Sequence, residues 1–598
     1  MLRSRWQIRS MFLKANRRSK DGKSHVYYTL NESVRVSGHR VVQRRVLHLG
    51  ELNTTQLDRW QRTIETIHED GRRQQLRLFT DREACAPRAE DVVEVVLSSL
   101  RLRQPKQFGA PWVGCRLWEE LELDRFWQQA LGAEAGDVAW AKVVELLAVN
   151  RLCAPRSELS LHQKWFPQVA MDFLLETDAR VAEKDRLYRC LDKLGAHKAA
   201  LEQHLAGRWR DLFGARFELL LYDLTSTYFE GEVAGVDKAQ RGYSRDGRPD
   251  CKQIVLALIV TPEGLPLSYE VFAGNRADTT TLPEILEAVE AKHGRAERVW
   301  VFDRGLVEEA NLEALRARGA RYLVGTRKSE LRRHEQRLLS GDWHQVSDWV
   351  RVQLVAADGQ TYVLAQSAPR AQKEAAMRVR VVRGLMRDLV RLRQSLRHGQ
   401  LIDPEKLRHR LGRLHERWPA AWRYVKLEVA GLRLRWHWDR AALQRAAARD
   451  GAYLLRTNLT ATDPAQLWQQ YIQLTEVEAA FRALKSELAL RPIWHWKSER
   501  VEAHVMVAFL GYALWVTLKQ KLRRVAPSLT PWQVLELLGR LQLIEVWFKT
   551  RDQRALCLLR ITEPDAAQAA LLHQLSWRLP DQPPPKIYQH QIPNVWET

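Results

Sequence analysis

The chain has 598 residues, which is enough for several domains. It carries 94 Lys and Arg against 72 Asp and Glu, and the net charge of +22 points to a polyanionic partner, foremost nucleic acid. Six scattered cysteines without CxxC or Cys/His ligand spacing argue against a disulfide framework and against a zinc finger. The longest apolar run, 14 residues at 505–518, suits a buried helix better than a membrane span, and the start has no apolar signal segment. We therefore expect a cytoplasmic protein with no membrane partner.

The first third of the chain changes from β to helical patterning. Residues 5–50 alternate polar and apolar side chains around two turn signals, Asp21-Gly22 and Ser37-Gly38, which predicts a small basic β element. From about 55 to 210, apolar residues recur every three or four positions, as in DVVEVVLSSLRL at 91–102. This spacing predicts a helical module.

The middle of the chain predicts an α/β core. A strand at 217–224 is followed by two more strands, a helix at about 279–293, a fourth strand that ends at Asp303, a helix and a fifth strand. This order is that of an RNase H-like fold, so the fold class is multidomain α/β. The expected domains are a basic β element at 1–54, a helical module at 55–210, the first part of the core at 211–329, an inserted β and helical domain at 330–448, the second part of the core at 449–520, and a helical C-terminal region with a Pro-rich tail at 521–598.

The inserted domain concentrates positive charge. Residues 370–450 hold 21 Lys and Arg but only 8 Asp and Glu. Four tryptophans lie among these basic residues: Trp418, Trp422, Trp436 and Trp438. A nucleic-acid-binding surface and a solvated Arg-rich helical hairpin are equally consistent with this composition.

Two carboxylates end apolar strands of the predicted sheet. Asp223 follows the run LLLY, and Asp303 follows VWVF. Chemistry in open α/β sheets gathers near strand ends, and a pair of carboxylates with waters and substrate phosphates suits Mg²⁺. Taken singly, Asp223 is more readily a cap of the following turn, and Asp303 is more readily a partner of Arg304. Two such strand ends in one sheet favour a metal site, which needs a third ligand.

A later helix supplies that candidate. Tyr471, Leu474, Glu478, Arg482 and Lys485 share one stripe of an α-helix by their spacing of three, four, four and three. An intrahelical pair between Glu478 and Arg482 on a surface helix is the alternative. A neighbouring apolar stripe, Phe481, Leu484 and Leu488, instead places Glu478 beside a core.

With this order of elements, Asp223, Asp303 and Glu478 resemble the catalytic triad of the DDE transposases of bacterial insertion sequences. The chain is most similar to the group marked by Tyr, two residues, Arg, three residues, Glu, six residues and Lys. Tyr471, Glu478 and Lys485 match that spacing, whereas Leu474 replaces the Arg. The segments YDLTSTYFEG, VFDRG and VEAAFRALKSELALRPIWHWKSERVEAH agree as well, so the resemblance runs from about 217 to 520.

The resemblance implies a transposase that cuts and joins DNA at the terminal inverted repeats of its element. It implies two Mg²⁺ ions, with Mn²⁺ as a substitute, held by Asp223, Asp303 and Glu478. It implies double-stranded end and target DNA as partners and a homodimer in the synaptic complex. Tyr471 and Lys485 are then expected to position DNA; Arg482 joins them because it shares their stripe. A noncatalytic DNA-binding relic and an RNase H-like nuclease without strand transfer remain the alternatives.

Trp-His-Trp occurs twice, around His437 and around His495. Neither histidine has a partner ligand at local metal spacing. The sequence therefore predicts aromatic packing at both positions and no zinc.

Overall fold

The computed structural model describes residues 10–20, 23–37, 40–51, 63–67, 73–77, 93–103, 105–132, 138–294, 297–334, 337–338, 342–357, 360–460 and 463–588. The chain divides into two units. The first is Met1–Gln104 with Ile544–Arg560 and Gln582–Thr598, and the second is Pro105–Leu543 with Ile561–Asp581.

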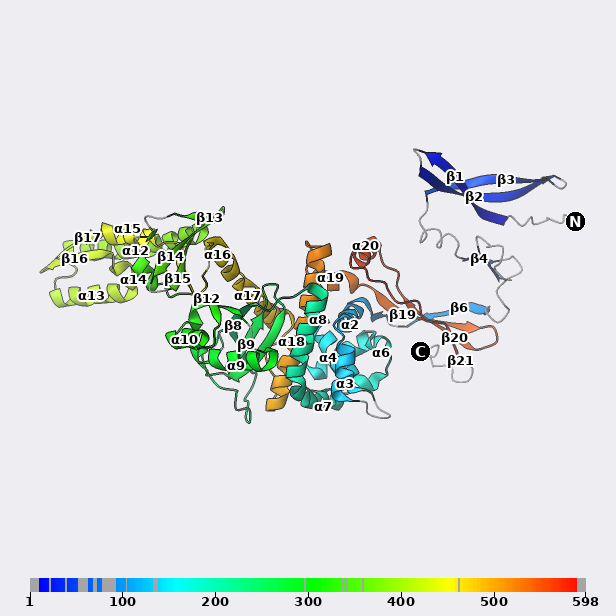
Figure 1. The fold of residues 1–598 in the computed structure, drawn as a ribbon, viewed down its shortest axis with the longest axis horizontal. Helices are drawn as coiled ribbons and strands as arrows, with labels where there is room; N and C mark the ends of the chain where they lie inside the picture. The colour runs from blue at the N-terminus through cyan, green and yellow to red at the C-terminus, as the bar shows by residue number, and fades with distance from the viewer. Residues whose placement is uncertain are drawn as a thin grey trace. The chain divides into compact units, whose positions relative to one another are not determined.

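The first unit is built from strands (Figure 1). β1 (Ser10–Lys20), β2 (Lys23–Ser37) and β3 (Arg40–Glu51) form an antiparallel meander, which agrees with the β element expected at the start of the chain. The turn residues Asp21-Gly22 lie outside the described residues. A separate hairpin and a four-strand ladder complete the unit: β4 (Thr63–Ile67) with β5 (Arg73–Arg77), and β6 (Val95–Leu102), β19 (Gln542–Thr550), β20 (Ala555–Ile561) and β21 (Lys586–Tyr588).

Two helical predictions in this unit are wrong. Residues 91–102 were expected to be helical, but β6 is a strand that pairs with β19, with Lys549 opposite Val96. The C-terminal region expected to be helical at 521–598 contains the strands β19 and β20. The strand that pairs with β6 lies more than four hundred residues downstream. The local spacing of apolar residues contains no information about such a distant partner.

The second unit contains a nine-stranded sheet in the order β10-β9-β8-β11-β12-β18-β15-β14-β13. Its first five strands have the predicted RNase H-like order: β8 (Leu219–Tyr228), β9 (Gln253–Val260), β10 (Pro266–Ala273), β11 (Val299–Phe302) and β12 (Arg321–Gly325). β8 is antiparallel to β9 and parallel to β11, and β11 is parallel to β12. The fold class is therefore the expected one, a mixed α/β protein with an RNase H-like core.

The two faces of this sheet are covered by different helices. Tyr222 and Leu224 of β8 join an apolar cluster with α8 (Lys198–Phe213), α9 (Leu282–His293) and α10 (Glu309–Ala317). Alternate strand residues point to opposite faces, so Asp223 belongs to the other face. There α17 (Leu474–Arg482) packs on β8 and β9, and α18 (Ser498–Val525) brings Phe509 against Tyr269 of β10.

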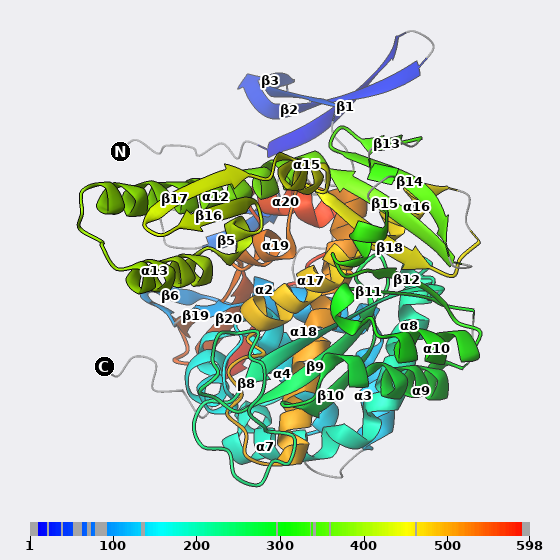
Figure 2. The same ribbon diagram turned by 90° about the vertical axis from the view of Figure 1, so that its left-hand side faces the viewer.

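The insertion is divided between the sheet and a helical lobe. Its strands β13 (His344–Ser347), β14 (Val350–Ala357) and β15 (Gln360–Ser367) do not form a separate domain, because β15 pairs with the core strand β18 (Ala452–Thr457) and the sheet continues. The rest is a mainly helical lobe (Figure 2). Its buried side chains form a separate apolar cluster. Its elements are α12 (Ala368–Arg397), α13 (Pro404–Arg417), α14 (Pro419–Trp422), β16 (Val425–Ala430), β17 (Arg433–Trp438) and α15 (Arg440–Ala448).

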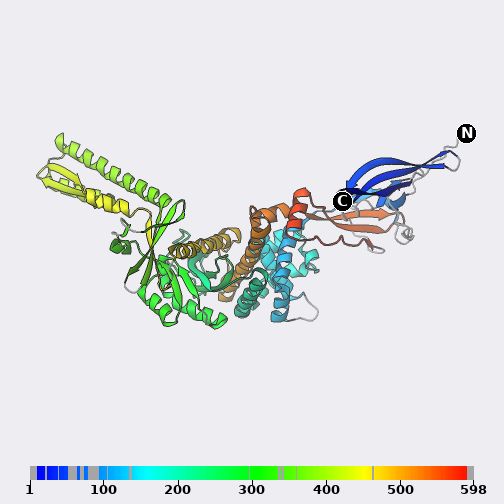
Figure 3. The ribbon, with the colours of Figure 1, turned by 45° about the horizontal axis from the view of Figure 1, so that its top comes forward.

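The tryptophans of the lobe are used for packing. Figure 3 shows the β16–β17 hairpin running beside the helices of the insertion. Trp418, Trp422, Trp436 and Trp438 are partly buried against the lobe's leucine cluster. The Trp418 indole N–H donates to Asp388 at 2.9 Å. These rings therefore complete a small core, and the Arg side chains carry the exposed charge.

Helices of the N-terminal part surround α18. They include α2 (Gly109–Glu120), α3 (Leu123–Leu131), α4 (Trp140–Cys153) and α7 (Lys184–Leu194), of which α2, α4 and α7 contact α18 directly. By length and composition α18 would suffice to cross a bilayer, yet 89% of its most apolar window is buried inside the protein. It is the buried helix that the apolar run at 505–518 predicts. The unit also holds α16 (Pro464–Ile472), α19 (Pro531–Leu538) and α20 (Ala566–Gln574).

Candidate active site

Asp223 and Asp303 lie side by side at one level of the sheet. β8 and β11 are parallel neighbours with Tyr222 opposite Phe302, and each aspartate is the next residue. Neighbouring strands are about 4.8 Å apart, so this register brings the two carboxylates into one neighbourhood. The parallel pairing is the structural reason that two distant sequence positions meet.

The two simpler roles weighed for these aspartates do not apply. β8 continues to Tyr228, so Asp223 stands within a strand and does not cap a turn; its Oδ1 accepts the backbone N–H of Leu224 at 2.8 Å. Among the described residues Asp303 forms no ion pair with Arg304, and its carboxylate accepts a hydrogen bond from Tyr471 instead.

Glu478 reaches the same neighbourhood from α17. Its side chain is exposed, and it forms no ion pair with Arg482 in the described part of the chain. Burial raises the pKa of Asp223 to about 6, and the negative charges of Asp303 and Glu478 add to the rise, against the backbone N–H of Leu224 and the positive charge of Arg245. Asp303 and Glu478 therefore lie near enough to Asp223 to affect the ionisation of its carboxyl group.

The three carboxylates are nevertheless not drawn together into a tight cluster. Within the described residues, the set of His, Cys, Asp and Glu ligand atoms that all lie within 4.8 Å of one another is a different one, Glu158, His495 and His504. The Asp223, Asp303 and Glu478 arrangement is thus open, with Asp303 and Glu478 facing solvent.

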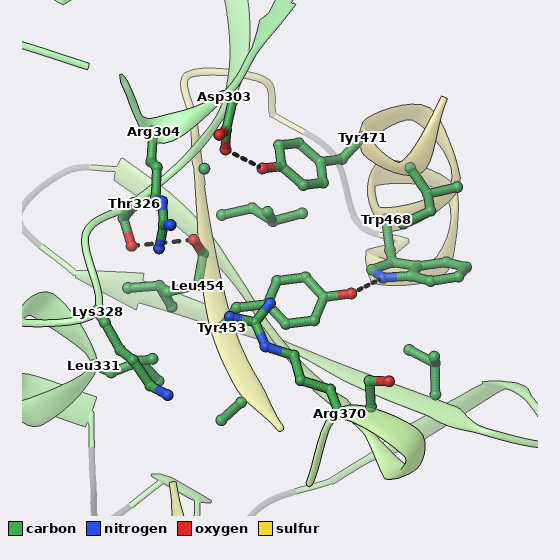
Figure 4. Close-up of a pocket in the computed structure, with 16 residues that line it drawn as sticks. Asp303, Arg304, Thr326, Lys328, Leu331, Arg370, Tyr453, Leu454, Trp468 and Tyr471 are labelled. Carbon is green, nitrogen blue, oxygen red and sulfur yellow. Dashed lines mark hydrogen bonds between the residues drawn. The ribbon is translucent and has the colours of Figure 1, made fainter. Parts of the chain in front are cut away.

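Tyr471 lies against Asp303 (Figure 4). Its hydroxyl donates to Asp303 Oδ1 at 3.2 Å, and burial together with the Asp303 charge raises the pKa of the phenol. Gly325, at the end of β12, makes room for this contact, because a Cβ there would overlap the Tyr471 hydroxyl. No local motif marks Gly325 for this role, which depends on its distance from Tyr471 in the fold.

A cavity of about 430 Å³ opens beside Asp303 and Tyr471. Trp468 donates its indole N–H to the Tyr453 hydroxyl on one wall, and the Arg370 guanidinium lies 5.3 Å from the centre of the Tyr453 ring (Figure 4). Arg304 and Lys328 also line it. Cationic and aromatic side chains thus border the carboxylate site on the side of the insertion.

The predicted stripe is interrupted at both ends. α16 and α17 meet at Gln473, and a π-helical turn spans Ala483–Glu487. Lys485 lies in this turn and forms an ion pair with the buried Asp246 at 2.7 Å, which Arg491 shares at 2.5 Å. Burial lowers the pKa of Lys485, although Asp246 opposes this. Of the three candidate DNA contacts, Tyr471 thus lies at Asp303, Lys485 is held at Asp246, and Arg482 is exposed.

His495 has no partner ligand at local spacing, as the sequence indicates, but the fold brings Glu158 and His504 to it from distant parts of the chain. The His495 ring also lies edge-on to the ring of Tyr188, with 6.2 Å between the ring centres. His437 is different, because it is exposed on β17, where its Nε2 lies 3.7 Å from Oε1 of Glu428.

Family models match two stretches of the chain. Residues 217–514 match the transposase DDE domain, and residues 13–80 match the N-terminal domain of IS1634 family transposases. Together the matches span more than half of the chain and include all three carboxylates. The chain therefore belongs to the DDE transposases of insertion sequences, and it acts as a DNA transposase.

Solved structures offer more remote similarities. The piggyBac transposase in a synaptic complex with hairpin DNA is 8% identical, with a TM-score of 0.34 over 73% of this chain and 81% of that chain. The Mos1 transposase in a paired-end complex with the left transposon end is 13% identical, with a TM-score of 0.14 over 32% of this chain and 60% of that chain. No curated protein matches the chain. Both TM-scores are too low for the site of this chain to be compared with the sites of those structures.

Proposed function

We propose that this transposase cleaves and joins DNA at Asp223, Asp303 and Glu478, which hold two divalent ions during the reaction. Mg²⁺ is the ion we assign, with Mn²⁺ as its substitute. The observation that carries the proposal is the register of β8 and β11, which sets Asp223 and Asp303 at one level beneath the helix of Glu478.

The residues present fit hard divalent cations. All three donors are carboxylates, the ligands that Mg²⁺ prefers together with water and phosphate oxygens. Burial and the negative charges of Asp303 and Glu478 raise the pKa of Asp223. A bound cation would offset these negative charges. The open spacing requires Glu478 to approach the two aspartates. The break at Gln473 and the exposure of Glu478 are consistent with such a local closure.

Asp223, Asp303 and Glu478 would hold the ions, whose chemistry would be to activate the attacking oxygen and stabilise the leaving oxygen of an in-line displacement. In this reaction the chain holds the carboxylates and the DNA in place. Tyr471 fixes the orientation of Asp303 through its hydroxyl. Arg482, which is exposed, contacts backbone phosphate, and Lys485 joins it by exchanging Asp246 for a phosphate.

The DNA partners in this proposal are the terminal inverted repeats and the target duplex, bound by a homodimer in the bacterial cytoplasm. Phosphate contacts orient DNA without reading its sequence, so the repeats must be recognised elsewhere. The helical module, the N-terminal β element and the basic insertion are the candidates. The net charge of +22 supports a polyanion as the partner.

The test is an assay with Mg²⁺ and a duplex that carries the ends of the element. We expect nicking at the ends and joining to target DNA by the wild type. Hydrolysis without joining would replace the proposal with a nuclease, and binding without cleavage would replace it with a DNA-binding relic. Asp223→Asn, Asp303→Asn and Glu478→Gln should each abolish cleavage while end binding persists.

A further inference from the structure

A second cluster of potential ligands lies buried in the same unit, apart from the three carboxylates. Glu158 at the start of α5 (Glu158–Ser160), His495 in the loop after the π-helical turn and His504 in α18 bring one ligand atom each to within 4.8 Å of one another. Their exposed fractions are 4%, 6% and 5%. Nothing in the proposed transposition chemistry uses these side chains.

His504 is oriented as a metal-binding histidine would be. Its Nε2 lies 3.0 Å from the Leu490 carbonyl, which places the ring proton on Nε2 and leaves a lone pair on Nδ1. Nδ1 is buried and has no hydrogen-bond partner among the described residues. A backbone carbonyl that fixes the tautomer of the ligating imidazole is a common outer partner in metal sites.

The spacing of the other two ligands is also informative. His495 Nε2 and Glu158 Oε1 are 3.6 Å apart, which is too long for a hydrogen bond. Ligand atoms that surround Zn²⁺ tetrahedrally at their usual bond lengths are roughly 3.3 to 3.6 Å apart. The gap between this nitrogen and this oxygen therefore suits a shared ion better than a direct bond.

We propose that Glu158, His495 and His504 form a Zn²⁺ site. Two imidazole nitrogens and one carboxylate oxygen match the borderline character of zinc and are distinct from the all-carboxylate donors at Asp223. A cavity of about 180 Å³ adjoins the three side chains and leaves room for water or hydroxide as the fourth ligand.

Arg151 lines the same cavity as the three ligands, and its positive charge opposes a cation there. Its guanidinium is directed to the backbone, because Nη1 donates to the carbonyls of Ala489 at 3.1 Å and Leu488 at 3.4 Å. An anionic fourth ligand such as hydroxide would offset the remaining positive charge.

Such an ion would join two parts of the second unit that are distant in sequence. Glu158 belongs to the helical part before the core, whereas His495 follows the helix of Glu478 and the π-helical turn. The site would thus hold the segment after Glu478 against the N-terminal helices.

The test measures zinc in the purified full-length chain by atomic absorption. We expect one zinc per chain in the wild type, and we expect Glu158→Gln and His495→Ala to weaken binding at least about tenfold. His437→Ala is the matched control, because His437 stands in the same Trp-His-Trp sequence but is exposed on β17. Cobalt substitution should give the visible absorption of a tetrahedral site in the wild type and in the control.

Two outcomes would overturn the site. One is a wild-type chain that contains no zinc after growth in zinc-supplemented medium and whose unfolding temperature does not respond to stoichiometric zinc sulfate. The other is equal zinc content in Glu158→Gln, His495→Ala and the wild type. An Asp223→Asn, Asp303→Asn double variant should retain its zinc, and loss of zinc there would assign the ion to the carboxylate site instead. If His495→Ala does not fold, Glu158→Gln and the wild-type titration decide the question.

Discussion

The carboxylate site and the Glu158, His495, His504 cluster differ in openness and in ligand chemistry. Asp303 and Glu478 face solvent, and the three carboxylates keep apart, whereas the cluster is buried and its ligand atoms lie within 4.8 Å of one another. An open, all-oxygen site can exchange hard ions, water and phosphate during a reaction. A buried site with two imidazoles suits an ion that remains bound. The second unit thus keeps the proposed catalytic carboxylates apart from the proposed zinc site.

The largest expected effect is on cleavage. Glu478→Gln should lower the rate of end cleavage about a thousandfold or more, because loss of a charged ligand removes several kcal/mol of transition-state stabilisation. Glu476→Gln is the control on the same helix, since Glu476 pairs with Lys519 and Arg523 of α18. Equal loss in both variants would indicate a folding defect and not a ligand role.

Metal removal should separate the two sites. Withdrawing Mg²⁺ should stop cleavage with little change in the unfolding temperature, whereas a zinc-selective chelator should lower the unfolding temperature by several degrees. Bound ligand stabilises the folded state by about 2.7 kcal/mol at one hundred times its dissociation constant. The measurement is the unfolding temperature after Mg²⁺ or Zn²⁺ alone is added back. An equal rise in unfolding temperature with both ions would contradict the distinction between the two sites.

Gly325→Ala should lower the cleavage rate about tenfold, equivalent to about 1.4 kcal/mol. The added Cβ would displace the Tyr471 hydroxyl and release Asp303 from its hydrogen bond. Tyr471→Phe removes the same bond without crowding. The double variant should therefore lose much less cleavage rate than the product of the two single losses. A loss equal to that product would show that Gly325 does not act through the Tyr471 hydroxyl.

Asp223→Asn should stabilise the metal-free protein above pH 6. Folding raises the pKa of Asp223 from 3.8 to about 6, so stability that is present at low pH is lost as pH rises through this interval. The full shift corresponds to about 3 kcal/mol, and partial exposure to solvent reduces the expected gain to about 1 kcal/mol. Denaturant unfolding at pH 4 and pH 8 measures the difference, which should be negligible at pH 4. A variant that is less stable than the wild type at pH 8 would contradict the raised pKa.

The smallest expected effect concerns Arg482. Arg482→Ala should weaken binding to all duplex sequences alike and reduce the slope of log affinity against log salt by about 1. Arg316→Ala is the control, because Arg316 lies on α10, which covers the other face of the sheet, and pairs with Glu309. A sequence-selective loss, or no change in the salt slope, would remove Arg482 from the phosphate contacts.

Much of the core was predictable because its signals are local. Asp223 and Asp303 each end an apolar run, and the order of strands and helices limits how those runs can pair. The stripe of Glu478 was also visible, although the break at Gln473 and the π-helical turn alter where its ends point. The order of strands was thus predictable from the sequence, whereas the shape of the Glu478 helix was not.

The remainder depends on contacts between distant segments. The sequence of β6 has the apolar spacing of a helix, but its pairing with β19 makes it a strand. Glu158 is distant from His495 in sequence, and only the fold brings the two together. Gly325 matters only through its distance from Tyr471. Each of these is a tertiary effect that no window along the chain contains.

The most direct test of the carboxylate site is anomalous diffraction from Mn²⁺ in crystals of the chain bound to a transposon-end duplex. Two peaks about 3.5 to 4 Å apart, contacted by Asp223, Asp303 and Glu478, are the predicted result. Peaks away from these carboxylates, or a complex in which Glu478 stays apart from both aspartates, would contradict the account.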